Sequence, residues 1–231
     1  MDFNLNQINR LNSTKPLTVV FCLPGNSFSD KFLQSWSELL MWCVNNNIRP
    51  LINCQQGSNI YHLRAKCLGA DVRRGKYQQP FGGQVDYDFI MWLDSDQVFS
   101  PAQFERLLNH NVDVVSGLYL MANGTQFACV QNWDEQFYEQ NGYFQFLTPK
   151  DIENKKDLIE VSYNGMGFFL IKKGVIENLE YPWFMPTMYK IGDCEDFDSE
   201  DVAFCKKMQN KGYKLYVDPC VVVGHEKKVV L

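Results

Sequence analysis

The stretch YDFIMWLDSD, residues 87–96, decides the fold that we expect for this chain. Its first seven residues are almost wholly apolar, which is typical of a strand buried on both faces of a sheet. This strand runs directly into Asp94, Ser95 and Asp96. In an open α/β sheet, ligands bind where the strands reach their carboxyl ends. The two carboxylates are therefore expected at the mouth of a binding site.

The segments on either side of this stretch alternate between strand-like and helix-like patterns. Before residue 121 the expected elements are strands at 17–24, 49–54 and 112–120, with helices from Ser27, over 58–68 and from Pro101. After it we expect a strand at 165–174, a helix at 199–211 and strands at 214–217 and 220–223. Residues 121–158 and 181–198 are expected to be mainly loop. This alternation predicts an α/β fold with a mostly parallel sheet covered on both faces.

Composition predicts one soluble globular domain over residues 1–231, with a loosely held tail at 1–16. Of the 231 residues 45% are hydrophobic and 21% are charged, and the net charge is −5. These values exclude a disordered chain, a collagen and a small disulfide scaffold. The acidic balance, without a run of four basic residues, gives no electrostatic basis for generic binding to nucleic acids or to anionic membranes.

The cysteines and the N-terminus favour a cytoplasmic location. The eight cysteines are scattered without a CxxC pair, which is typical of buried thiols in a reducing compartment. The N-terminal residues lack a basic segment followed by an apolar stretch, so no secretory signal is predicted. The uncharged stretch 114–133 is interrupted by polar residues, so no stable membrane insertion is expected.

The two aspartates after the central strand suggest a metal site. Residues i and i+2 of an extended backbone project to the same side, so Asp94 and Asp96 could share one hard cation, Mn²⁺ or Mg²⁺. Such an ion could bridge two phosphates. Alternatively, the two aspartates only form a turn and cap the helix that begins at Pro101.

The order of these and later motifs resembles the GT-A glycosyltransferases, in particular the inverting group called family two. The resemblance covers Thr18 to Glu226 and rests on a strand ending at Pro24, a helix with Asn59 and Arg64, FIMWLDSD (89–96), VVSGLYL (114–120), NGMGFFLIKKGVIENL (164–179), DSEDVAFCKKMQNKGYKLYVDP (198–219) and VGH (223–225). It implies a Rossmann-like α/β/α sandwich of the GT-A type. In such a sandwich, residues 17–120 would bind the nucleotide, and residues 121–231 would bind the acceptor and carry the catalytic groups.

The resemblance also implies a role for particular residues. A nucleotide-sugar donor, with UDP as the expected nucleotide, would contact Pro24, Arg64, Asp94, Ser95, Gly165 and Gly167. Asp96 would be the direct metal ligand, with Asp94 and His225 completing the shell. Asp201 would be the catalytic base and Glu200 would orient the acceptor. Each also has a plainer interpretation: a solvated arginine, a glycine turn, a surface histidine, or acids that cap a helix.

The acceptor side is less defined by the sequence. Trp183 and Phe184 could stack on an acceptor sugar or base, or could belong to the core. The acceptor itself could be a glycan or another molecule with a hydroxyl group, including a modified nucleic-acid base. The expected activity is that of a metal-dependent hexosyltransferase. A nucleotidyltransferase-like enzyme is one alternative, although LPGNSFSDKF (23–32) lacks the basic, glycine-rich loop of that class. A non-catalytic module that binds sugar nucleotides or glycans is the other.

Overall fold

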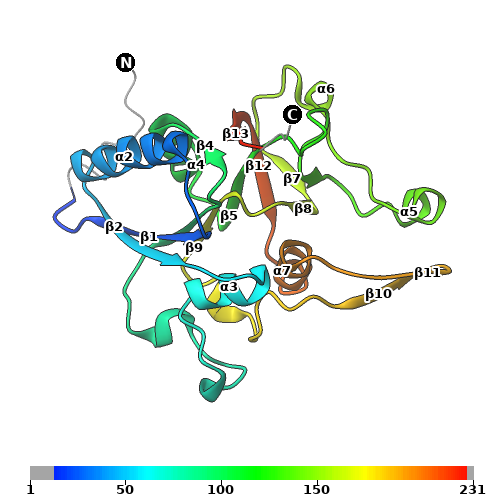
Figure 1. Cartoon of the computed structure of the whole chain (residues 1–231), viewed down its shortest axis with the longest axis horizontal. Coiled ribbons are helices and arrows are strands. Elements are labelled where there is room, and N and C mark those ends of the chain that lie inside the picture. The colour runs from blue at the N-terminus through cyan, green and yellow to red at the C-terminus, as the bar shows by residue number, and fades with distance from the viewer. Residues whose placement is uncertain (1–12, 228–231) are drawn as a thin grey trace.

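The computed structural model describes residues 13–227, and its centre is a seven-stranded sheet (Figure 1). The strand order is β2 (Ile48–Gln55), β1 (Leu17–Pro24), β3 (Phe89–Leu93), β9 (Phe168–Lys172), β5 (Val114–Leu118), β12 (Leu215–Val222) and β7 (Ile159–Val161). Only β9 and β7 run antiparallel to the other strands of this sheet. The expectation of an α/β fold with a mostly parallel sheet is therefore confirmed.

Helices cover both faces of the sheet because its central strands are apolar on both sides. On β1, Phe21 packs into the core shared with α2 (Asp30–Asn45) and α4 (Pro101–His110), whereas Cys22 packs into the core shared with α3 (Ile60–Cys67) and α7 (Glu200–Gln209). Strand β3 alternates in the same way, with Met91 in the first core and Trp92 in the second. The result is three layers, helices, sheet and helices.

The helix starts follow from capping residues. The predicted Ser27 cap is wrong: α2 begins at Asp30, because the side chain of Ser29 accepts a hydrogen bond from the amide of Phe32. Helix α4 begins at Pro101 as predicted, behind a capping box formed by Ser100 and Gln103. No helix within residues 13–227 combines the length and apolar character needed to cross a membrane.

Two segments differ from the sequence prediction. The strands predicted at 214–217 and 220–223 form one strand, β12, with a register irregularity between Val217 and Val222. The predicted loop 181–198 contains an antiparallel hairpin of β10 (Met188–Ile191) and β11 (Cys194–Phe197). The sequences of the two strands, MYKI and CEDF, do not alternate between apolar and polar residues, so they lack the pattern that predicts a half-buried strand.

Short elements complete the fold. They are η1 (Val72–Arg74), η2 (Pro80–Gly83), β4 (Gln97–Val98), β6 (Cys129–Val130), α5 (Glu135–Asn141), α6 (Pro149–Ile152), β8 (Tyr163–Asn164), η3 (Ile176–Asn178) and β13 (Gly224–His225). Strand β13 pairs with β4, which brings the end of the described chain beside the segment that follows β3. Of the predicted tail 1–16, residues 1–12 lie outside the described residues.

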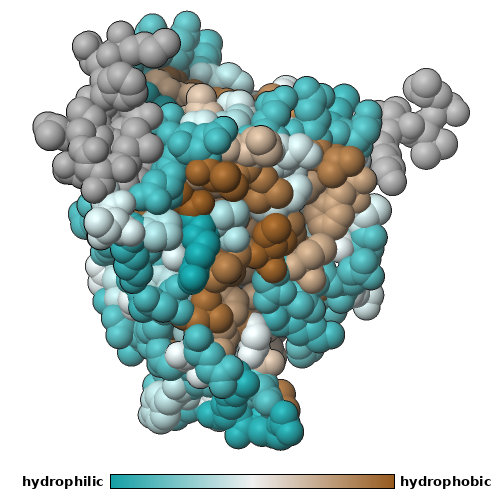
Figure 2. All heavy atoms as spheres, turned by 90° about the vertical axis from the view of Figure 1, so that its left-hand side faces the viewer, coloured by the Kyte–Doolittle hydropathy of each residue, from teal (hydrophilic) through white to brown (hydrophobic). Residues whose placement is uncertain are grey.

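Apolar side chains also reach the surface on the side of α2 and β2, which faces the viewer in Figure 2. Exposed examples on these elements are Met41 and Val44 of α2 and Ile52 of β2. The residues predicted to bind substrate are not among these exposed hydrophobic side chains. Most of them lie at the end of β1, just after β3, just before β9, in α3, at the start of α7 and in β13.

Candidate functional site

The predicted polar residues meet where the parallel strands end. Asp94 follows β3, and its amide donates to the carbonyl of Gly167, which precedes the antiparallel β9. His225 follows β12 and contacts Leu120, which lies just beyond β5. Helix α3 contributes Arg64 from the side. Most of the site residues predicted from the sequence therefore lie along one edge of the sheet, although they form two separate clusters.

The Arg64 cluster consists of Arg64, Asp94 and Glu200. The guanidinium of Arg64 donates to both carboxylate oxygens of Asp94, at 3.0 and 3.1 Å, and its Nε donates to Glu200 at 3.2 Å. The arginine side chain is 3% exposed and lies over the indole ring of Trp92. Burial alone would lower the pKa of Arg64, but the charges of Asp94 and Glu200 outweigh burial and raise it. The alternative of a solvated arginine is therefore wrong.

The Asp96 cluster consists of Asp96, His225 and Lys227. Oδ2 of Asp96 lies 3.1 Å from Nε2 of His225 and 2.8 Å from Nζ of Lys227. Partial burial would raise the pKa of Asp96, but hydrogen bonds from these two partners outweigh it and hold the pKa well below its usual value. The side chains of Asp96 and Lys227 are 39% and 42% exposed, so this cluster is open to solvent where the Arg64 cluster is closed.

The divergence of Asp94 and Asp96 corrects the prediction that both bind one metal ion. Strand β3 ends at Leu93, and the amide of Gln97 donates to the carbonyl of Asp94 at 3.1 Å, so the motif is a turn. The rule that i and i+2 share a side holds for extended backbone only. Asp94 points to α3, where the guanidinium of Arg64 donates a hydrogen bond to each of its carboxylate oxygens. Asp94 is therefore not placed beside Asp96 as a metal ligand.

Asp96 and His225 together have the chemistry of metal ligands. Nδ1 of His225 is 2.6 Å from the carbonyl oxygen of Leu120, and because a carbonyl only accepts, Nδ1 carries a proton. Nε2 then faces Asp96 and either takes a second proton or binds a metal. The hydrogen bond to Asp96 raises the pKa of His225, although burial opposes it. Within residues 13–227 no three His, Cys, Asp or Glu side chains form a group that could hold a metal ion.

The amino end of α7 carries Glu200 and Asp201, whose side chains have different partners. Glu200 contacts Arg64, and its pKa is raised by burial and by the nearby charge of Asp201, with Arg64 opposing. Asp201 accepts hydrogen bonds from Ser199, from the amide of Val202 at 2.9 Å and from the hydroxyl of Tyr163 at 3.0 Å. All three of these donors are neutral, whereas Glu200 is paired with the cation of Arg64.

Gly165 and Gly167, which were predicted to contact the donor, are both buried beside the ring of Tyr119. A Cβ on Gly165 would lie 2.0 Å from the hydroxyl of Tyr119, and a Cβ on Gly167 would lie 2.9 Å from the same ring. Glycine is required at both positions because the ring of Tyr119 packs against this turn and leaves no room for a side chain. Tyr119 also meets the ring of His225 edge-on, with centroids 4.9 Å apart.

The prediction that Trp183 and Phe184 stack on an acceptor is also wrong. Trp183 is fully buried and Phe184 is 1% exposed. Phe184 stacks on Phe204 of α7, and the indole N–H of Trp183 donates to the carbonyl of Leu179. Their place is the core beneath α7, which was the alternative interpretation.

Pro24 and Ser95 lie at the same sheet edge as the clusters. Pro24 is buried at the end of β1, opposite Gln55 of β2. The next residue, Gly25, passes so close to the turn after β3 that a Cβ there would lie 2.6 Å from Cβ of Ser95. Close packing of the two strand exits thus explains why a glycine follows Pro24.

Sequence reasoning missed several groups at this edge. Lys227 and Tyr163 contact the two most important predicted acids, Asp96 and Asp201. The carbonyl of Leu120 orients His225. Tyr163 directly precedes Asn164, the first residue of a motif that the sequence did single out, so its position gave a signal. No local pattern marks Lys227 or the Leu120 carbonyl.

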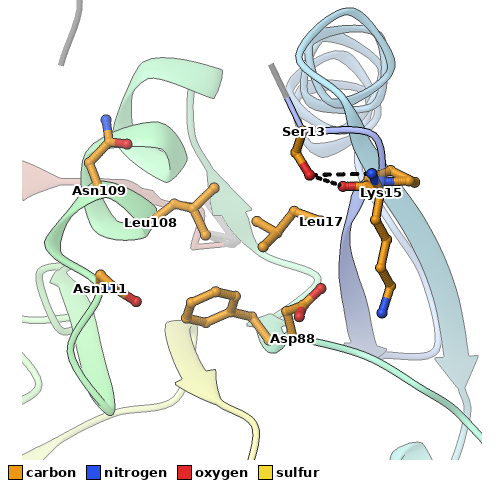
Figure 3. A pocket seen from close by; sticks show the side chains of 9 residues that line it. Ser13, Lys15, Leu17, Asp88, Leu108, Asn109 and Asn111 are labelled. Atoms are coloured by element: carbon orange, nitrogen blue, oxygen red, sulfur yellow. Dashed lines mark hydrogen bonds between the residues drawn. The ribbon is translucent and has the colours of Figure 1, made fainter. Parts of the chain in front are cut away.

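One well-formed cavity lies away from the predicted residues. Figure 3 shows it at the amino ends of β1 and β3, with a volume of about 350 Å³ and with Lys15, Leu17 and Asp88 in its lining. Substrates of an open α/β sheet bind at the opposite, carboxyl ends of the strands. The positions of the Arg64 and Asp96 clusters are therefore a better guide to the site than the size of this cavity.

Comparisons with known proteins bear on the fold. No family model and no curated protein sequence matches the chain. Among solved structures, A197 from STIV is similar, with 19% sequence identity over 93% of this chain and 96% of that chain, and a TM-score of 0.50. GalNAc-T7 with UDP, GalNAc and Mn²⁺ is also similar, with 12% identity over 94% of this chain and 45% of that chain, and a TM-score of 0.49. At 19% identity, the likeness to A197 shows a shared fold.

Proposed function

We propose that this protein is a GT-A type glycosyltransferase that moves a hexose from a nucleoside diphosphate, preferably UDP, to an acceptor hydroxyl with inversion. The observation that carries the proposal is that Arg64, Asp94, Asp96, Glu200, Asp201 and His225 all lie along the carboxyl edge of the sheet, although in separate clusters. The same residues occur in a motif order that resembles family two. Their position at the edge where α/β sheets bind ligands supports the proposal.

Asp201 is the proposed base. The acceptor O–H gives its proton to the free electron pair of the Asp201 carboxylate, the oxygen attacks the anomeric carbon, and the bond from that carbon to the diphosphate breaks. The nucleoside diphosphate leaves with the bonding electrons. Tyr163 and the amide of Val202 hold the carboxylate in place. Arg64 fixes Glu200 and Asp94 at the floor of the site.

A divalent cation, Mn²⁺ or Mg²⁺, fits Asp96 and His225 and would supply positive charge for the leaving diphosphate. The support is the pairing of an ionised carboxylate with a histidine whose other nitrogen is held by the Leu120 carbonyl. Asp94 is not part of this proposed shell.

A second candidate function, a non-catalytic module that binds sugar nucleotides or glycans, is favoured by one observation. Both aspartates already have protein cations as partners, Arg64 for Asp94 and Lys227 for Asp96. A site neutralised in this way could bind a ligand without turnover.

Donor hydrolysis and transfer by the purified protein separate these candidates. With Mn²⁺ and a panel of UDP- and GDP-sugars, the transferase must release nucleoside diphosphate. Asp201→Asn should keep donor binding and lower turnover about 10²- to 10⁴-fold. Asp193→Asn, at an exposed position shortly before α7, is the matched control and should keep wild-type turnover. Donor binding without any turnover in the wild type would contradict the transferase and favour the binding module.

A further inference from the structure

A second hollow lies along α7, between the helix and the segments that carry α5 and the β10–β11 hairpin. Its volume is about 290 Å³, and its lining includes Trp133, Phe144, Tyr189, Lys206, Gln209 and Asn210. In Figure 1, α5 and the hairpin project on the same side of the molecule, beyond α7. We call this hollow the aromatic cleft.

The rings of the aromatic cleft are partly exposed and are held in place by one another. Trp133 meets Phe144 edge-on with centroids 4.8 Å apart, and Phe144 contacts Tyr138 at 4.7 Å. The hydroxyl of Tyr138 lies 2.7 Å from that of Tyr189, which ties α5 to the hairpin. Trp133, Phe144 and Tyr189 are each intermediate between buried and exposed. The cleft therefore presents aromatic surface that is already positioned.

Both lysines that line the aromatic cleft are paired with acids. The ammonium of Lys206 lies 5.3 Å from the ring of Trp133 and 4.5 Å from that of Tyr189, and Asp198 pairs with it at 2.9 Å. Lys190 pairs with Glu195 at 3.1 Å, and the exposed carboxylate of Glu135 also lines the cleft. Aromatic surface with paired lysines and side-chain amides suits an uncharged ligand rich in hydroxyl groups. It does not suit a polyanion, whose binding depends on unpaired basic residues.

The aromatic cleft is connected to the proposed base through one residue. The ring of Tyr163 lies 6.3 Å from that of Trp133 at an interplanar angle of 27°, and its hydroxyl donates to Asp201. Lys206 and Gln209, which line the cleft, continue along α7 from Asp201. A chain of sugars with its attacked hydroxyl at Asp201 could thus extend along α7 into the cleft.

We propose that the aromatic cleft binds an oligosaccharide, namely the part of the acceptor beyond the sugar that is glycosylated. The identification of this saccharide as the acceptor rests on the proposed function. The binding of a saccharide in the cleft does not. Trp133 lies beside Tyr163 and Lys206 and is partly exposed, and the exposed part of its ring would pack against the apolar face of a pyranose. Nε2 of Gln209 already donates to the carbonyls of Val161 and Ser162, so its Oε1 and the side-chain amide of Asn210 are the groups proposed to bind the hydroxyls.

Saturation-transfer NMR of the full chain with maltotriose, chitotriose and mannotriose tests this proposal. At least one trisaccharide should bind, and Trp133→Ala should weaken that binding roughly ten-fold. Trp133→Phe, which keeps an aromatic face, should recover most of the affinity. Tyr77→Ala removes an exposed aromatic residue on the loop between α3 and η2 and should change nothing. Circular dichroism shows whether each variant is folded.

The outcomes distinguish the cleft from the transferase. If a trisaccharide binds in a Trp133-dependent way but the protein turns over no nucleotide-sugar, the saccharide site is supported and the proposed function is refuted. If the protein turns over a donor but no trisaccharide binds in a Trp133-dependent way, the saccharide site is refuted and the transferase is supported. A single-stranded oligonucleotide that binds with the same dependence on Trp133, when no trisaccharide does, would replace the glycan with a nucleic-acid ligand.

Discussion

Asp94 and Asp96 are two residues apart, yet they belong to differently built regions. In the Arg64 cluster, Asp94 receives both arms of a buried guanidinium that Glu200 also contacts. In the Asp96 cluster, the partners are a histidine and a half-exposed lysine from the end of the described chain. A turn of the backbone separates two carboxylates that the sequence pattern alone would treat as one pair.

The difference teaches what each cluster is suited to do. A buried charge must keep its partner, because an unpaired charge away from water is costly, so the Arg64 cluster is expected to be rigid. Solvent-exposed ion pairs contribute little to stability and can exchange partners. The Asp96 cluster is therefore suited to ligand exchange. We expect variants of the Arg64 cluster to change mainly stability and variants of the Asp96 cluster to change mainly ligand binding.

The largest expected effect follows from breaking the Arg64 cluster. Arg64→Met leaves Asp94 and Glu200 without their buried cation and should lower the free energy of unfolding by about 3–5 kcal/mol. Urea denaturation measures the loss. The matched control is Lys227→Met, which removes the cation of the exposed cluster and should cost less than about 1 kcal/mol. Similar losses in both variants would contradict the distinction between the clusters.

The next effect concerns ligand binding at the Asp96 cluster. Asp96→Ala removes the proposed metal ligand and should weaken Mn²⁺-dependent binding of UDP more than about ten-fold, with little change in stability. Isothermal titration with UDP, with and without Mn²⁺, measures the difference. If the variant and the wild type bound UDP equally well in Mn²⁺, Asp96 would not be a metal ligand.

A smaller effect of opposite sign is expected at Lys227. Its ammonium contacts Oδ2 of Asp96 and would compete with the proposed divalent cation for that oxygen, so Lys227→Met should strengthen Mn²⁺ binding roughly five-fold at low salt. Paramagnetic relaxation of water protons during a Mn²⁺ titration gives the affinity. Lys214→Met, at an exposed lysine paired with Glu160, serves as the control and should leave the affinity unchanged. Weaker Mn²⁺ binding in Lys227→Met would show that the lysine assists the metal.

The smallest effect is on acid stability. The pKa of Asp96 is lowered in the folded protein, so its contribution to stability is present above the unfolded pKa, about 4, and is lost as the pH falls toward the folded value. Wild type should therefore lose stability more steeply than Asp96→Asn between about pH 4 and pH 2. Urea midpoints across that range give the two slopes. Parallel slopes would mean that His225 and Lys227 do not stabilise the carboxylate.

Features that depend on local pattern were predicted well from the sequence. The apolar run before Asp94 predicts a strand buried on both faces, and β3 is completely buried between the two cores. Pro101 marks the start of α4 because proline suits the first turn of a helix. Periodicity and capping are local properties, and they were sufficient for the layers and for most strand positions.

Features that depend on contacts between distant segments were not predicted. The fork of Arg64 reaches Asp94 across 30 positions of the chain, and Lys227 reaches Asp96 across 131. The sequence around Trp183 does not distinguish an exposed tryptophan from a buried one, and in the structure Trp183 lies in the core. The candidate residues could be named from the sequence, but their partners could not, because pairing depends on where the strands end.

The hydrogen bond that orients His225 ends on the main chain of Leu120. Every residue type at position 120 supplies the same carbonyl oxygen, so no substitution there deletes the acceptor. The direction of the imidazole is thus inherited from the path of the backbone beyond β5. The side chain of Leu120 packs against the core, but a substitution there would leave His225 oriented as it is, provided that the backbone beyond β5 keeps its path.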